Sequence, residues 1–377
     1  MDAPWIGGAE RYFADLCDGL AARGLDVHAV STEGGVLLPW LRERLTGGVS
    51  LHAVMARPVF DDSFVGNVVR GLRPFIDIRA LLRGLHPDIV HLNNGGYPGS
   101  HVCRSAAFAT SCPTVMTVHS VARPRRGGGR RTYVVLDRLV WRSLDRVICP
   151  VQASARSLRV ERGAPADLLR VINCGTAMRA PAVEDVQRAR ARLAPNGELV
   201  VGMVVAPATD EGARFKGHDV LLEAIVGGPQ AMRVAIVGHD PGNAYRERAA
   251  SLGVDDKLIF LSGYRDTAPL MEAFDLLVVP STRNEALPLV VLEAMAARTP
   301  VLASRLSGIP EAVIDRESGF TFEPGNVGAL RALLNLGAED RPLLARLGER
   351  AHALWRERFS LERMVSATVD VYMELLA

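Results

Sequence analysis

The fold is decided by the stretch at residues 276–296, which reads L-L-V-V-P-S-T-R-N-E-A-L-P-L-V-V-L-E-A-M-A. Its first residues, Leu276–Val279, form a continuous apolar run of the kind found in strands buried on both faces. The following segment, Leu287 to Ala297, has the composition of a helix. A buried strand that leads directly into a helix is typical of a parallel sheet covered by helices. We therefore expect an α/β fold.

Two glutamates accompany the expected helix, Glu285 before it and Glu293 within it. At a helical rise of ~1.5 Å per residue they lie ~12 Å apart, which matches the length of a nucleotide diphosphate sugar. Free N–H groups at the helix N-terminus favour a diphosphate. Glu285 is then expected to accept hydrogen bonds from the sugar and Glu293 from the ribose. The alternative is that Glu285 is only a charge at a helix N-terminus and Glu293 a solvated side chain.

Composition sets the broad class of the protein. The chain has 377 residues, of which 48% are hydrophobic and 23% are charged, with a net charge of +2. These values are typical of a globular protein with two domains, each with its own core. All cations except Lys216 and Lys257 are arginines. We attribute that bias to genomic base composition and predict no nucleic-acid partner.

The cysteines and apolar runs predict a cytoplasmic protein. The cysteines are odd in number and scattered, without a Cys-x-x-Cys or Cys/His spacing, which favours a reducing compartment over a structural zinc site. No apolar run reaches the ~18 residues of a spanning helix, and no signal peptide is recognisable. No D-x-D follows a strand, so we predict no catalytic metal and no cofactor.

Short apolar runs alternate with helix-like segments along the chain. The runs are Asp26–Val30, Val49–Val54, Asp88–Leu92, Thr114–His119, Asp145–Cys149, Leu169–Ile172, Leu199–Val205, Arg233–Val237, Lys257–Leu261, Leu276–Val279 and Val301–Ala303. This alternation predicts two Rossmann-like, doubly wound parallel-sheet domains, residues 1–178 and 179–358, joined near Ala177–Pro195. The ligand is expected in the cleft between them.

The N-terminus lacks an element that this architecture needs. The chain opens M-D-A-P-W-I-G-G-A-E-R-Y, a loop that runs into a helix at Ala9 without a preceding strand. Either a strand lies upstream of a truncated or misplaced start, or this half-sheet lacks one. We favour the first interpretation, because an empty central position would leave backbone groups buried and unpaired.

Candidate phosphate-binding residues lie at the starts of two helices. Lys216 is a compact charge suited to a diphosphate, and Gly217 lets the chain turn closely into a helix. Arg214 would supply a second, forked contact to the phosphates. Gly7 and Gly8 precede the first helix, where backbone amides can approach a phosphate. The alternative is that Arg214 and Lys216 are ordinary surface cations.

Two other features have competing interpretations. His119 ends a strand at its carboxyl end, where an imidazole reaches a cleft, although a lone histidine more often has no ligand. The arginine-rich run Arg123–Arg131 reads as a solvated loop, with a grip on an anionic acceptor or a phospholipid surface as the alternative. Phe64–Leu85 reads as a helix pair interrupted by Pro74, with a membrane-interface helix as the alternative.

These motifs together resemble the family 4 retaining glycosyltransferases, which have the GT-B fold of two Rossmann-like domains. The resemblance covers nearly the whole chain. It rests on G-G-A-E-R at Gly7, T-V-H ending at His119, V-I-N-C-G at Val171, R-F-K-G at Arg214, I-V-G at Ile236, G-Y-R-D at Gly263, the stretch from Pro280, and S-G-I-P-E at Ser307.

The resemblance implies a role for each matching residue. Lys216, Glu285 and His119 would be the catalytic residues, and residues 359–377 would form a C-terminal helix that crosses back to the first domain. Tyr264 and Arg265 would flank the nucleobase. The donor-binding set would be Gly7, Gly8, Arg214, Gly217, Tyr264, Arg265, Ala286, Leu287, Leu289, Val290 and Glu293. Arg214 stands in for a family arginine that is absent after the strand ending at Val205.

The expected function is transfer of a hexosyl unit, with retention, from a UDP- or GDP-sugar to an acceptor hydroxyl without a metal. The acceptor would be a glycan, a lipid-linked molecule or a small molecule, and peripheral contact with the inner membrane face is an open alternative. A non-catalytic sugar-nucleotide-binding partner and a GT-B nucleotide-sugar epimerase are the rival interpretations.

Overall fold

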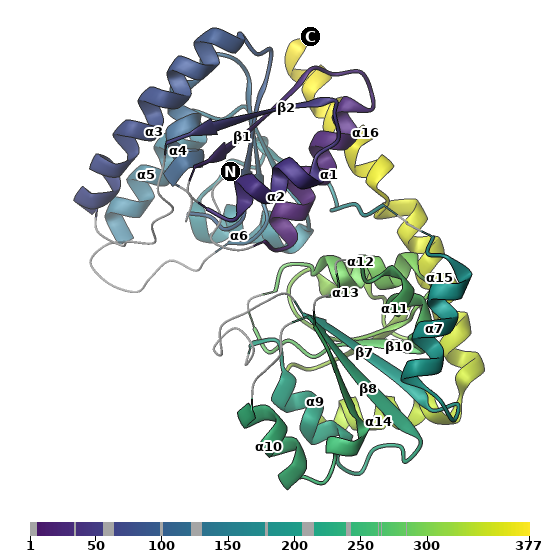
Figure 1. Cartoon of the computed structure of the whole chain (residues 1–377). Coiled ribbons are helices and arrows are strands. Elements are labelled where there is room, and N and C mark those ends of the chain that lie inside the picture. Colours follow the sequence, from purple (N-terminus) through teal and green to yellow (C-terminus); the bar gives the residue numbers. More distant parts are fainter. Residues whose placement is uncertain are drawn as a thin grey trace. The chain divides into compact units, whose positions relative to one another are not determined.

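The computed structural model describes residues 6–33, 35–55, 64–98, 101–121, 130–177, 180–205, 215–238, 243–262, 264, 266–283 and 285–377. The chain forms two compact units (Figure 1). Unit 1 comprises Met1–Gly175 and Leu361–Ala377, and unit 2 comprises Thr176–Ser360.

Unit 1 is an α/β unit whose described strands are all parallel. They are β1 (Val27–Thr32), β2 (Val49–Val54), β3 (Val90–Asn94), β4 (Thr114–Val118), β5 (Arg146–Cys149) and β6 (Leu169–Val171). The helices are α1 (Gly8–Ala21), α2 (Leu37–Arg44), α3 (Phe64–Leu85), α4 (His101–Ala109), α5 (Arg130–Arg142), α6 (Gln152–Arg162) and α16 (Leu361–Leu376). Every residue of β4 is buried, as expected for a central strand covered on both faces.

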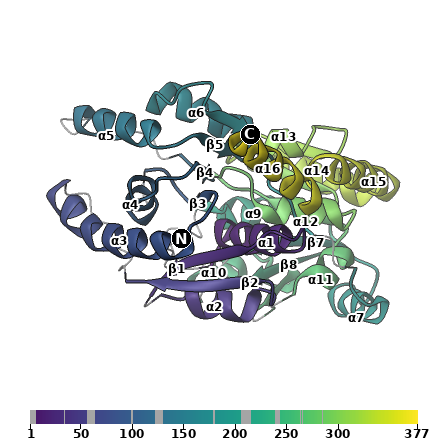
Figure 2. The ribbon, with the colours of Figure 1, turned by 90° about the horizontal axis from the view of Figure 1, so that it is seen from above.

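The strands of unit 1 form two separate sheets. One has the order β1-β2 and the other β3-β4-β5-β6. Within the described ranges no strand joins β1 to β3, so each of these two strands has one edge without a strand partner. Helices α1 and α16 pack against each other in this unit and lie side by side in both views (Figure 2).

Unit 2 has one parallel sheet of the doubly wound type, with the order β12-β11-β10-β7-β8-β9. Its strands are β7 (Leu199–Val205), β8 (Met232–Gly238), β9 (Leu258–Leu261), β10 (Leu276–Val279), β11 (Val301–Ser304) and β12 (Gly319–Phe322). The helices are α7 (Val183–Leu193), α9 (His218–Ile225), α10 (Asn243–Ser251), α11 (Ala268–Ala273), α12 (Leu289–Ala296), α13 (Ile309–Ala312), α14 (Val327–Glu339) and α15 (Arg341–Arg358), with a 3₁₀ turn, η1, at Asp255–Lys257.

The order of strands in unit 2 fixes where its loops meet. The order in which the chain adds strands reverses between β7 and β10. From β7 the chain adds β8 and β9 on one side, and then adds β10, β11 and β12 on the other side. Ligands of such sheets bind outside the carboxyl ends of the strands at this reversal. The loops after β7 and β10 are therefore the expected place for a site in this unit.

Three sequence-based expectations about elements need correction. Phe64–Leu85 is one helix and not a pair, because Pro74 forgoes a single backbone hydrogen bond without ending the helix. The helix after Glu285 begins at Leu289 and not at Leu287, with Pro288 as its N-cap in extended conformation. Strand β12 was not predicted, because G-F-T-F is too short and too poor in aliphatic residues to stand out.

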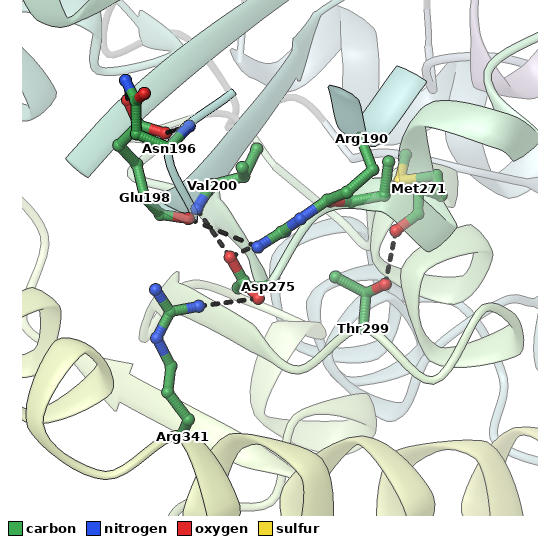
Figure 3. A network of polar contacts seen from close by, with 9 residues as sticks. Arg190, Asn196, Glu198, Val200, Met271, Asp275, Thr299 and Arg341 are labelled. Atoms are coloured by element: carbon green, nitrogen blue, oxygen red, sulfur yellow. Dashed lines mark hydrogen bonds and ion pairs between the residues drawn. The ribbon is translucent and has the colours of Figure 1, made fainter. Parts of the chain in front are cut away.

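A carboxylate at the amino edge of the unit 2 sheet joins three elements (Figure 3). Asp275, just before β10, accepts hydrogen bonds from Arg190 of α7 and from the backbone N–H of Val200 in β7, at 2.8 and 2.7 Å. Its other oxygen lies 2.8 Å from Arg341 at the start of α15. Arg190 also donates to the carbonyl of Ala273 at 2.9 Å. This network ties α7 and α15 to the sheet.

Two properties of the described residues bear on the sequence analysis. No helix among them is long and apolar enough to cross a membrane. The cysteines are free thiols, and four of them are buried: Cys17, Cys103, Cys149 and Cys174.

Replacing Asp275 by asparagine is expected to destabilise unit 2. The variant loses both ion pairs and places an amide between donors, so the free energy of unfolding should fall by about 1–3 kcal/mol. Urea denaturation measures the change. Asp185→Asn is the matched control, because Asp185 pairs only with the exposed Arg188 on the same helix and should cost less than about 0.5 kcal/mol. Equal effects of the two variants would contradict the structural role of Asp275.

Candidate active site

Two loops at the carboxyl ends of β7 and β10 are held against each other in unit 2. Gly217 has φ +80°, and a Cβ there would lie 1.9 Å from the carbonyl oxygen of Pro280. The backbone N–H of Thr282 donates to the carbonyl of Phe215 at 2.8 Å. The guanidinium of Arg283 stacks over the Phe215 ring at 3.9 Å. Only glycine permits this approach of the two loops.

The approach of the loops brings two predicted catalytic residues together. Lys216 donates a hydrogen bond from Nζ to Oε1 of Glu285 and forms an ion pair with it. Ser281 Oγ donates to the same carboxylate oxygen at 3.1 Å. The Glu285 side chain is 10% exposed and that of Lys216 is 35% exposed, so the carboxylate is nearly buried while the lysine reaches the surface.

The loop between Glu285 and α12 is also anchored. The backbone N–H of Gly308, in the loop before α13, donates to the carbonyl of Ala286 at 2.8 Å. Leu287 and Leu289 are buried and fix the start of α12 in the core. The N–H groups of Leu289 and Val290 lie in the first turn, where a helix offers donors without partners in the helix itself.

The later helix start changes the geometry expected for the two glutamates. Glu293 lies in the second turn of α12 and is half-buried. Only the four steps from Leu289 to Glu293 are helical, which accounts for about 6 Å of rise. The rest of the separation from Glu285 is loop, so the ~12 Å expected from a continuous helix does not apply.

His119 follows β4 in unit 1, where its side chain is held by β3. Its ring nitrogen Nε2 lies 2.8 Å from Oδ1 of Asn93, and its backbone N–H donates to the carbonyl of Asn94 at 3.0 Å. The ring of Tyr12, from α1, packs edge-on against it with centroids 4.6 Å apart. Burial lowers the pKa of His119 to about 3, with a smaller effect from His91. The imidazole is therefore neutral at neutral pH.

The glycines at the start of α1 are engaged within their own helix end. Gly7 is the N-cap, and its N–H donates to Oε2 of Glu10 at 2.8 Å. Gly8 is the first residue of α1 and is exposed. Of the two amides predicted to approach a phosphate, that of Gly7 thus has an internal acceptor.

The remaining predicted residues are either elsewhere in unit 2 or undescribed. Tyr264 is 42% exposed, and its hydroxyl accepts a hydrogen bond from Arg192 of α7 at 3.3 Å. Arg214 and Arg265 lie outside the described residues, as does most of Arg123–Arg131. In the described part of the chain, no group of three or more His, Cys, Asp or Glu side chains is arranged to hold a metal ion.

Sequence reasoning missed two residues that hold the predicted ones. Ser281 orients Glu285 and follows the decisive apolar run directly, so its position after a strand end was a usable signal. Asn93 contacts His119 across neighbouring strands. Its position at the end of an apolar run was the only local signal, and the partner could not be read from the sequence.

Two parallel, doubly wound Rossmann-like units are the hallmark of the GT-B class of glycosyltransferases. The family model of Glycosyltransferase Family 4 matches residues 6–178 of the chain, and the family model of Glycosyl transferases group 1 matches residues 210–353. The chain therefore belongs to the group 1, family 4 glycosyltransferases and is a glycosyltransferase enzyme.

Individual relatives agree with this assignment, and solved structures share the fold. The chain is 30% identical to a D-inositol 3-phosphate glycosyltransferase of Acidothermus cellulolyticus, over 98% of the chain and 86% of the relative. A protein of the same name from Saccharomonospora viridis is 31% identical, over 98% and 90%. Among solved structures, a glycosyltransferase of Rickettsia africae superposes with a TM-score of 0.81 at 19% identity, covering 100% and 97%. Anabaena Alr3699/HepE in complex with UDP gives 0.79 at 21% identity, covering 99% and 98%.

Substitution of Gly217 by alanine is expected to destabilise unit 2 far more than the same change at Gly227. Both glycines have a left-handed φ, +80° and +73°, but a Cβ on Gly227 meets no atom closer than 3.9 Å. Gly227→Ala should cost about 1 kcal/mol for the backbone conformation alone. Gly217→Ala must also displace the Pro280 carbonyl and should cost about 3 kcal/mol or more.

Chemical denaturation of the two variants tests this difference. A free energy of unfolding that falls equally in both would show that the loops do not need the close contact of Gly217 with Pro280.

Proposed function

We propose that this chain is a retaining, metal-independent glycosyltransferase that moves a hexosyl unit from a UDP- or GDP-sugar to an acceptor hydroxyl. The observation that carries the proposal is the pairing of Lys216 with Glu285 at the carboxyl ends of β7 and β10. A cation and a carboxylate side by side match the two ends of a nucleotide sugar, a diphosphate and a polyhydroxy ring.

The chemistry assigns each residue a task. Departure of the nucleoside diphosphate builds negative charge on its terminal phosphate, which Lys216 stabilises after leaving Glu285. The N–H groups of Leu289 and Val290 add fixed dipoles at the N-terminus of α12. Glu285, held by Ser281, accepts hydrogen bonds from the sugar, and Glu293 accepts from the ribose. The acceptor hydroxyl attacks from the face that the diphosphate leaves and passes its proton to the departing phosphate.

The relatives narrow the choice of substrates. Anabaena Alr3699/HepE has been solved with UDP and with UDP-glucose, which favours UDP over GDP as the donor base. The relatives named D-inositol 3-phosphate glycosyltransferase favour a small, hydroxyl-rich acceptor over a long glycan. The cation–carboxylate pair bears on neither choice, because its proposed partners are the diphosphate and the sugar.

Peripheral contact with an anionic membrane is a further part of the proposal. On α5 the exposed apolar side chains of Val134, Val135 and Leu139 alternate with the exposed arginines Arg138 and Arg142. The acid of this segment, Asp137, is buried and points inward, where it pairs with Tyr97 and Arg162. The outer face of α5 is therefore apolar and cationic, which suits an anionic lipid surface.

Lys216→Ala is expected to abolish transfer while leaving the fold intact. The loss of one charge on the leaving group should lower kcat by about a hundredfold or more. Release of UDP from UDP-sugars in the presence of polyol acceptors measures it, and product NMR reports whether the anomeric configuration is retained. Lys257→Ala, the other lysine of the chain, is the matched control, since Lys257 only donates to the carbonyl of Pro229. Loss of activity in EDTA, or inversion at the anomeric carbon, would contradict the proposal.

Replacing Val135 and Leu139 by serine should reduce sedimentation of the chain with anionic vesicles. The double variant removes the apolar contacts but keeps the arginines, so binding to phosphatidylglycerol vesicles should fall several-fold. Val160→Ser on α6 is the control, because Val160 is 74% exposed on another helix. Equal binding by all three proteins, or no preference for anionic over neutral vesicles, would remove α5 as the membrane surface.

A further inference from the structure

Two histidines of unit 1 face each other across the neighbouring strands β1 and β2, which lie side by side in both views (Figures 1 and 2). The parallel register pairs Val30 with His52, and His28 lies two residues before Val30. Because side chains alternate between the two faces of a strand, His28 and His52 share a face. Their rings stack with centroids 5.1 Å apart, and Nδ1 of His28 lies 2.8 Å from Nε2 of His52.

The carboxylate of Asp26 sets the tautomer of the first ring. Its oxygen Oδ2 lies 3.4 Å from Nε2 of His28. An ionised carboxylate can only accept, so Nε2 of His28 carries the hydrogen. In the neutral ring Nδ1 is then a lone-pair acceptor that faces His52, and the hydrogen between the two rings belongs to Nε2 of His52. Each ring thus directs one nitrogen at the same shared hydrogen.

A metal ion can take the place of this shared hydrogen. Imidazole nitrogens bind Zn²⁺ at about 2.0–2.1 Å, which sets two nitrogens of a tetrahedral site about 3.3 Å apart. The nitrogens of His28 and His52 must therefore part by about half an ångström. The His28 side chain is 30% exposed, so its ring has room to turn and water can complete the coordination. The hydrogen of His52 then moves to its Nδ1.

The contact with Asp26 is also typical of a histidine that binds a metal. Such a histidine commonly donates its other N–H to a carboxylate, which orients the ring and raises its basicity. His28 has this arrangement, because Nδ1 faces His52 while Nε2 faces Asp26. Imidazole ligands suit Zn²⁺, Ni²⁺ and Cu²⁺, whereas Mg²⁺ and Ca²⁺ prefer oxygen ligands. The chemistry of the pair therefore selects among divalent cations.

We propose that His28 and His52 form a two-histidine site for a divalent cation that prefers nitrogen ligands, such as Zn²⁺, with Asp26 as the orienting carboxylate. His28 is the second residue of β1 and so lies near the amino end of that strand. Ligands of doubly wound sheets bind at the carboxyl ends instead. The ion therefore joins β1 to β2 and takes no part in glycosyl transfer.

Isothermal titration calorimetry of the full chain without a histidine tag tests the site. The wild type should bind a single Zn²⁺ ion and should also bind Ni²⁺, while Mg²⁺ should give no heat of binding. His28→Gln and His52→Gln should each remove the binding, because each leaves one imidazole. Asp26→Ala should weaken it about tenfold or more, as expected for the loss of a carboxylate that orients a ligand.

A control variant and a spectroscopic measurement make the test specific. His86→Gln is the matched control, because His86 is an exposed histidine of the same unit that follows α3 and lies on neither strand. It should bind Zn²⁺ as the wild type does. NMR of the chain labelled with ¹⁵N-histidine identifies the ligands. Zn²⁺ should shift the ring nitrogen signals of two of the nine histidines, and one of these signals should be missing from each of the variants His28→Gln and His52→Gln.

The outcomes separate this inference from the proposed function. Binding that survives in both His28→Gln and His52→Gln, or an equal loss in His86→Gln, would place the ion elsewhere and overturn the site. Equal binding of Mg²⁺ would also overturn it, because charge alone would then explain the binding. UDP release should be unchanged in the two variants, and a loss in either would contradict the separation from the reaction. A wild type that binds Zn²⁺ but transfers no sugar would remove the proposed function and leave this site.

Discussion

The close approach of Gly217 to the carbonyl oxygen of Pro280 is the contact on which the unit 2 site depends. No side chain fits between them, since a Cβ would lie 1.9 Å from that oxygen. The approach allows the hydrogen bond from Thr282 N–H to the Phe215 carbonyl, and the flanking residues Lys216 and Glu285 then meet. The position of this ion pair thus follows from the backbone, and its side chains need little independent ordering.

Charged side chains lie at both ends of the strands of the unit 2 sheet, but they are paired differently at the two ends. At the amino edge, Asp275 binds Arg190, Arg341 and the Val200 N–H, which satisfies its charge completely and stabilises the layer of helices. At the carboxyl edge, Lys216 has one carboxylate partner and remains partly exposed. The charged side chains at the two edges are therefore paired to different degrees, and the network at the amino edge contributes to the stability of the sheet.

The sequence was sufficient to locate most of the strands but not to predict the contacts between elements. Buried parallel strands are apolar along their whole length, so runs such as Leu199–Val205 and Leu276–Val279 coincide with β7 and β10. That Lys216 and Glu285 lie at one edge of the sheet could be anticipated because both come after such runs, but their ion pair was not predicted. The start of α12 could not, because Pro288 fits both the last extended residue and the first helical turn. Contacts such as Asn93 with Ala9 join positions that no local pattern relates.

The two units hold their polar side chains by different means. In unit 2, Lys216 pairs with Glu285 and keeps part of its side chain in solvent. A ring nitrogen of histidine accepts a hydrogen bond only when the ring is unprotonated and holds its hydrogen on the other nitrogen. Burial supplies the first condition for His119, and the anchored amide of Asn93 supplies the second.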